Sequence, residues 1–144
     1  MPKCYLLAIG GGSSVDQQSN NITLFNLVEQ LNFPAQKWPP AGALLPLEVH
    51  AYFMLDAFEV NQKFELRFVL VGDNGLETPT GAFSHRSTTV RYRTRTFGLP
   101  APPAAGNYEL KVEYRPHGDA DWLRDPVCWP VRVAENEPRP AVTH

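Results

Sequence analysis

The sequence predicts an all-β protein: an antiparallel β-sandwich of about seven strands, with at most one short helix near residues 22–32. Three observations support this. Apolar and polar residues alternate through several segments, turn-forming residues separate those segments, and a 144-residue chain with 43% hydrophobic residues can fill one core. We therefore expect a single domain over residues 1–134 and a flexible C-terminal tail over residues 135–144.

The first part of the chain gives one strand, one loop and one ambiguous segment. Residues 4–10 are apolar and are expected to form a buried strand. Residues 10–21 are rich in glycine, serine and asparagine and are expected to form a mobile loop. In residues 22–33 the apolar positions fit both a helical period and a period of two. Because the neighbouring segments read as strands, a strand is favoured there, and a helix is the alternative.

The middle of the chain contains two strands and a turn. Residues 45–55 hold apolar side chains in phase, and residues 63–71 alternate from Phe64 to Leu70. The second half of that strand is apolar on both faces. Asp73-Asn74-Gly75 follows, and Asn-Gly tolerates the positive φ angles that a tight hairpin turn demands.

Three further strands are predicted in the last part. Residues 88–97 are rich in threonine, arginine and aromatic residues, which is a strand composition. Residues 107–115 show the clearest alternation of the chain, with one apolar and one charged face. The final strand, residues 129–133, includes Pro130, which predicts an edge position or a bulge because proline cannot donate to a sheet ladder.

Three short motifs carry a resemblance to a known fold family: Phe33-Pro34, Asp73-Asn74-Gly75, and Gly106-Asn107-Tyr108 with the alternating strand after it. With these motifs the chain resembles immunoglobulin-like β-sandwiches, in particular a group of small bacterial sandwich proteins. The resemblance implies a fold and no activity. The cysteine pair that flanks a core tryptophan in antibody domains is absent, since neither Cys4 nor Cys128 has that spacing.

Composition excludes several classes of protein. A net charge of −2 disfavours a nucleic-acid binder that works by bulk charge, and two cysteines cannot make a disulfide-rich scaffold or a four-cysteine zinc site. We expect Cys4 and Cys128 to be free thiols, with a bridge between terminal strands as the alternative. No segment is apolar over a membrane-spanning length, and the N-terminus lacks the features of a secretory signal, so a cytoplasmic protein without a membrane partner is expected.

The least ordinary local feature is a run of arginines. Arg91, Arg93 and Arg95 alternate on one predicted strand and therefore share a face, and Arg86 lies upstream. Such a stripe could bind an acidic protein surface, a phosphate or a nucleic-acid backbone. The alternative is a solvated sheet face, on which the arginines pair across strands with Glu48, Glu65, Glu109 or Glu113. Tyr92 faces the other way and is expected to enter the core.

No catalytic residue, metal site or cofactor is predicted. The four histidines lack ligand spacing, the acidic turn around residues 119–125 lacks a calcium-loop pattern, and the glycines at 10–12 lack the lysine of a phosphate-binding loop. Trp38, set among prolines, is a candidate for stacking on a sugar ring, although large aromatic side chains usually fill a core.

These observations favour a non-enzymatic β-sandwich module that mediates protein–protein interaction or assembly, either with an unidentified protein or as a homo-oligomer. The predicted binding residues are Arg91, Arg93, Arg95, Arg86 and Trp38. A module that binds carbohydrate or a small ligand through exposed aromatic residues is the first alternative. A hydrolase or metal-dependent enzyme is the second.

Overall fold

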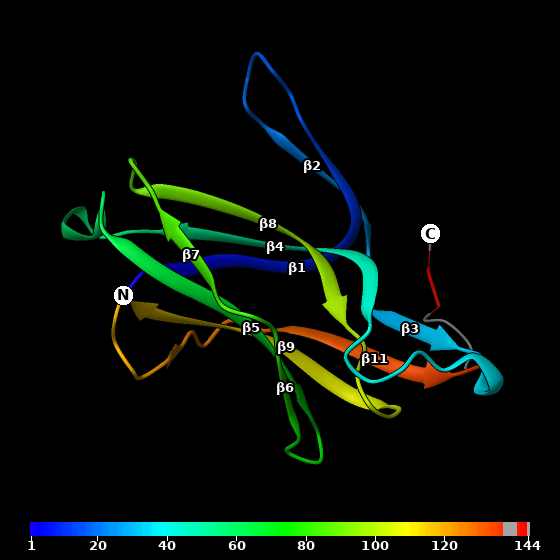
Figure 1. Ribbon diagram of the computed structural model, residues 1–144. Helices are drawn as coiled ribbons and strands as arrows, with labels where there is room; N and C mark the ends of the chain where they lie inside the picture. Colours follow the sequence, from blue (N-terminus) through cyan, green and yellow to red (C-terminus); the bar gives the residue numbers. More distant parts are fainter. Residues whose placement is uncertain (137–140, 144) are drawn as a thin grey trace.

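The computed structural model describes residues 1–136 and 141–143, and its strands form two sheets (Figure 1). The first sheet has four strands in the order β2-β1-β4-β8. All of its neighbouring strands are antiparallel. Their bounds are Lys3–Val15 (β1), Ile22–Leu27 (β2), Leu44–Met54 (β4) and Arg91–Pro100 (β8).

The second sheet has seven strands. Its main path runs β3-β11-β9-β5-β6, while β7 pairs with β5 and β10 pairs with β9. Their bounds are Gln30–Phe33 (β3), Lys63–Gly72 (β5), Glu77–Pro79 (β6), Phe83–Arg86 (β7), Gly106–Pro116 (β9), Leu123–Arg124 (β10) and Trp129–Glu135 (β11). Two single-turn 3-10 segments, Ala35–Lys37 and Ala57–Glu59, are the helical residues in the described chain.

The all-β prediction is confirmed, but the expected number of strands was too low: the described residues form eleven rather than about seven. Residues 22–33 form two strands in place of one, and β6, β7 and β10 are short strands at the margins of the second sheet. The split at residues 22–33 has a local cause. Asn26 has a φ of 52°, and after Leu27 the chain leaves the first sheet and pairs parallel to β11 as β3.

The prediction of a mobile loop over residues 10–21 was wrong for its first half. β1 continues through the glycines to Val15, because β2 pairs with it between Gly10, opposite Leu27, and Val15, opposite Ile22. The loop is the short turn at 16–21, where the Asp16 carboxylate accepts hydrogen bonds from the backbone N–H groups of Gln18 and Ser19. The resulting hairpin extends beyond the end of β2 to the top of the view in Figure 1.

The core lies between the two sheets and takes one face of each. In β9 the alternating residues Tyr108, Leu110, Val112 and Tyr114 are buried, as their pattern predicted. In β4 the inward side chains are Val49, Ala51 and Phe53, which leaves the even-numbered residues on the outer face. The fully buried large side chains include Phe53, Phe64, Phe68, Ile9, Leu66, Leu70, Leu99 and Leu110.

Turn and proline positions follow their predicted chemistry with one difference. Residues 73–75 form the turn between β5 and β6, but only Gly75 of the Asn-Gly pair has a positive φ, of 82°.

Pro130 lies in a strand that has neighbours on both sides, yet β3 begins to pair with β11 only at Arg132. At Pro130 itself β11 therefore borders one strand, which is where proline is tolerated.

The ends of the chain bear on three expectations. Cys4 and Cys128 are both free thiols. The described part of the chain contains no helix that could cross a membrane. Glu135 belongs to β11, and half of the predicted tail at 135–144, namely residues 137–140 and 144, lies outside the described residues.

A histidine–tyrosine pair joins the two sheets along one side. His85 of β7 and Tyr92 of β8 share a hydrogen bond of 2.7 Å, and the His85 ring stacks on Phe64 with centroids 5.8 Å apart. Tyr92 packs against the core, as predicted. Burial lowers the pKa of His85 below its ordinary value, so the neutral ring is the form that the fold favours.

This pair makes stability depend on pH. Because the folded-state pKa of His85 lies below its unfolded value of about 6.5, the unfolded chain binds more protons as the pH falls through that value, and stability declines. We expect the melting temperature to fall between pH 7.5 and pH 5.5, and this fall to shrink in His85→Gln. Gln62→Ala, which changes an exposed residue that does not titrate, is the control that should keep the wild-type pH dependence. An unchanged pH dependence in His85→Gln would contradict this assignment.

Candidate functional site

The predicted arginine stripe lies on the outer face of the first sheet. Arg91, Arg93 and Arg95 of β8 are all exposed, and they stand opposite Met54, Tyr52 and His50 of β4. Phe97 continues the same face and is 72% exposed. The alternation of β8 therefore places three cations and one aromatic ring on a single surface, as the sequence indicated.

The β1–β2 hairpin reaches back to this surface. Arg93 Nη1 donates a hydrogen bond of 2.9 Å to the carbonyl oxygen of Asn20 at the hairpin turn, and Arg95 Nη1 donates to Ser13 Oγ at 3.4 Å. Glycines permit the close packing inside the hairpin. A Cβ at Gly10 would lie 3.2 Å from the Phe25 carbonyl oxygen, and one at Gly11 would lie 3.1 Å from Asn26 Cβ.

A cavity of about 370 Å³ lies between the hairpin and the outer face of β4 and β8. We call it the hairpin pocket. The hairpin contributes apolar and small polar side chains, and the sheet contributes the aromatic and cationic ones. The lining residues are Ser13, Val15, Asn20, Ile22, His50, Tyr52, Arg93, Thr94 and Arg95. Its volume is within the range of natural small-ligand sites, roughly 300–1,000 Å³.

The charge of the stripe is only partly neutralised. Of the predicted cross-strand partners, only Glu48 approaches the arginine stripe. One of its carboxylate oxygens lies 3.9 Å from Arg95 Nη1, and the other shares a hydrogen bond of 2.9 Å with His50 Nε2. The other three predicted partners, Glu65, Glu109 and Glu113, pair with cations of the second sheet. Among the described residues Arg91 and Arg93 make no ion pair, so the outer face keeps a positive charge next to the pocket.

Tyr52 is the most unusual residue of the pocket. Its side chain is 8% exposed, and none of the described residues offers its hydroxyl a hydrogen-bond partner. Burial raises the pKa of this phenol, while the nearby Arg93 charge acts in the opposite direction. The hydroxyl therefore stays protonated at neutral pH and is a donor within electrostatic reach of a guanidinium.

The other two predicted binding residues lie elsewhere. Arg86 is on β7 of the second sheet, where it lines a separate hollow with Phe58, Tyr114 and His117. Trp38 packs against the core, edge-on to Phe33 with ring centroids 5.1 Å apart. That packing favours a structural role over a platform for sugar stacking.

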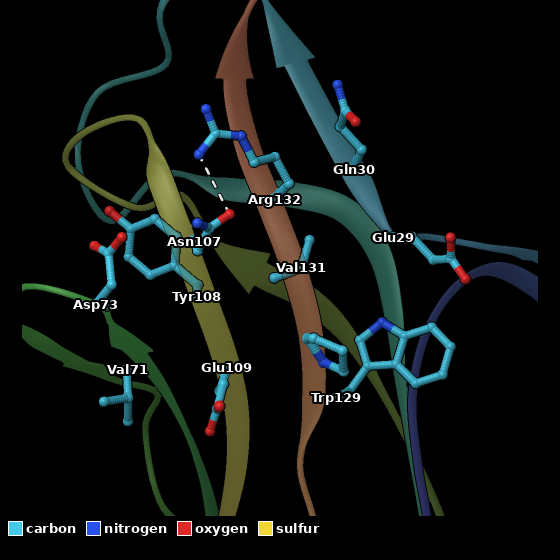
Figure 2. Close-up of a pocket in the computed structure, with 12 residues that line it drawn as sticks. Glu29, Gln30, Val71, Asp73, Asn107, Tyr108, Glu109, Trp129, Val131 and Arg132 are labelled. Carbon is cyan, nitrogen blue, oxygen red and sulfur yellow. Dashed lines mark hydrogen bonds between the residues drawn. The ribbon is translucent and has the colours of Figure 1, made fainter. Parts of the chain in front are cut away.

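A third hollow, of about 780 Å³, lies on the outer face of the second sheet (Figure 2). Arg132 Nη1 donates to Asn107 Oδ1 at 3.2 Å, while Glu29, Asp73 and Glu109 stand around the rim. Acidic and basic groups are mixed here. The described residues contain no cluster of three or more His, Cys, Asp or Glu side chains that could hold a metal ion.

The sequence reasoning missed His50, Tyr52 and the hairpin. A signal for the first two was present, because they continue the even-numbered face of β4 together with Glu48. The hairpin was missed because its glycines read as a loop. No family model matches the chain, and no curated protein is significantly similar to it.

The free Tyr52 hydroxyl has a consequence for stability. A buried donor without a partner costs about 1–3 kcal/mol, so Tyr52→Phe should leave the free energy of unfolding unchanged or raise it by about 1 kcal/mol. Tyr108→Phe is the matched control, since the Tyr108 hydroxyl donates to the Ala104 carbonyl oxygen at 2.7 Å. That variant should lose about 1 kcal/mol. Urea unfolding measures both. A loss in Tyr52→Phe as large as that in Tyr108→Phe would contradict the assignment of an unpartnered hydroxyl.

Proposed function

We propose that this protein is a non-enzymatic binding module, built on an immunoglobulin-like β-sandwich, that recognises an acidic segment of a partner protein through the outer face of β8. The observation that carries the proposal is the row Arg91, Arg93 and Arg95: three exposed cations on one face, with Glu48 as the one carboxylate approaching them among the described residues. Cations spaced every second residue match the period of an extended chain.

The immunoglobulin-like assignment is supported by strand order. In that fold strands A, B and E lie in one sheet, opposite C, F and G. In this protein β1, β4 and β8 lie in one sheet, and β5, β9 and β11 lie in the other. The same six strands in the same chain order fit the fold, with β2, β3 and the short marginal strands as additions.

The free edge of β8 supports a partner in extended conformation. Among the described residues β8 pairs with β4 alone, so its other edge presents unpaired backbone groups beside the arginine row. An added strand would take hydrogen bonds from that edge and place every second side chain on the arginine face. Glutamate or aspartate at those positions would meet the three guanidinium groups.

A peptide probe tests the proposal. An acetylated, fluorescein-labelled (Thr-Glu)₄ amide should bind the wild-type protein, and a (Thr-Gln)₄ amide should not, as measured by fluorescence anisotropy at constant ionic strength. The variant Arg91→Ala/Arg93→Ala/Arg95→Ala should lose at least tenfold in affinity while keeping its melting temperature to within a few degrees, because exposed charges contribute little to stability.

The control variant is Lys37→Ala/Lys63→Ala, which removes exposed positive charge away from β8 and should bind the acidic peptide as the wild type does. Equal binding by the triple arginine variant would remove the proposal. Preferential binding of a single-stranded oligonucleotide of the same net charge would replace the protein partner with a nucleic acid.

A further inference from the structure

We infer that the hairpin pocket is a recognition site for a single carboxylate, such as the side chain of a glutamate in a bound acidic segment, held by Arg93, Arg95 and Tyr52. This inference rests on the proposed function and deepens it, because it assigns one acidic side chain of the partner to a defined cavity. The remaining arginine of the row, Arg91, lies outside the pocket lining.

The donors of the pocket fit an oxyanion. Arg93 and Arg95 line it with guanidinium groups that already reach the hairpin through one Nη1 each, so their other N–H groups can turn to a ligand. The Tyr52 hydroxyl adds a protonated donor that none of the described residues satisfies. Hydrogen bonds from charged or buried donors to a carboxylate are stronger than those between neutral groups.

Charge balance favours a monoanion over a dianion. Two arginines face the pocket, and Glu48, 3.9 Å from Arg95, neutralises part of their charge. Two positive charges against one negative charge leave an excess that a single carboxylate balances. A doubly charged phosphate would exceed it and would meet twice the repulsion from Glu48.

The walls of the pocket fit the stem of an acidic side chain. Val15 and Ile22 of the hairpin supply apolar surface opposite the polar groups of the sheet. A glutamate could pack its methylene groups there while its carboxylate reaches the arginines and Tyr52. The cavity volume of about 370 Å³ leaves room for one such side chain.

The test is a titration with a small ligand that cannot span the arginine row. N-acetyl-glutamate N-methylamide is added to the ¹⁵N-labelled protein at constant ionic strength and pH 7, and backbone amide shifts are followed. We expect saturable changes at the hairpin pocket, at Ser13, Tyr52 and Thr94, in the millimolar range. The neutral N-acetyl-glutamine N-methylamide should produce none.

Variants with matched controls assign the donors. Tyr52→Phe and Arg93→Gln should each weaken binding by about tenfold, which corresponds to one charge-assisted hydrogen bond. Tyr5→Phe removes a neighbouring tyrosine hydroxyl and Lys37→Gln removes an exposed positive charge, both outside the pocket lining, and each should change the affinity by less than twofold. The spectrum of each free variant confirms that it is folded.

The outcomes separate this inference from the proposed function. If the acidic peptide binds through the arginine row but the glutamate derivative fails to saturate, or binds Tyr52→Phe as tightly as the wild type, the inference is overturned while the proposed function stands. Inorganic phosphate binding at the same residues with higher affinity would overturn the carboxylate assignment. Failure of both probes would overturn both proposals.

Discussion

The register between β4 and β8 determines the surface chemistry of this protein. It sets Tyr52 opposite Arg93 and His50 opposite Arg95 on the outer face, and Ala51 opposite Thr94 on the inner one. The buried hydrogen bond from Thr94 Oγ1 to the Ala51 carbonyl oxygen, at 2.9 Å, holds this register. Because side chains alternate along a strand, a slip of one residue would drive three guanidinium groups into the core. That cost excludes the alternative pairing, and the positions of the pocket residues follow from it.

The path of the β1–β2 hairpin also shapes this surface. A flat sheet would leave His50 and Tyr52 open to water, since they lie on the face away from the core. Gly10 and Gly11 permit close packing of β1 against β2, and the hairpin lies over His50 and Tyr52, whose exposed fractions are 2% and 8%. Two polar side chains are thereby buried outside the main core. Glu48 bonds to His50, whereas the Tyr52 hydroxyl has no partner among the described residues, and a bound group could compensate for its lost hydration.

Sequence patterns predicted the layers of the fold better than the details of the site. Alternation in residues 63–71 and 107–115 identified the inward faces correctly. Successive side chains of a strand point to opposite faces, so a strand with one buried face has an apolar residue at every second position. The arginine face of β8 followed from the same rule. The pocket did not, since it depends on contacts such as Arg93 to Asn20 that join residues 73 positions apart. No local pattern encodes the angle at which a glycine-rich hairpin returns to its sheet.

The exposed margin of β8 also affects self-association. A strand with one unpaired edge can template pairing with another copy of itself, which is a common route to aggregation. In an antiparallel pair of β8 strands, arginines every second residue would place like charges next to one another across the new seam, and such pairs are unfavourable. The row of arginines therefore disfavours dimers that pair through the free edges of two β8 strands. A chain of opposite charge could still pair with that edge.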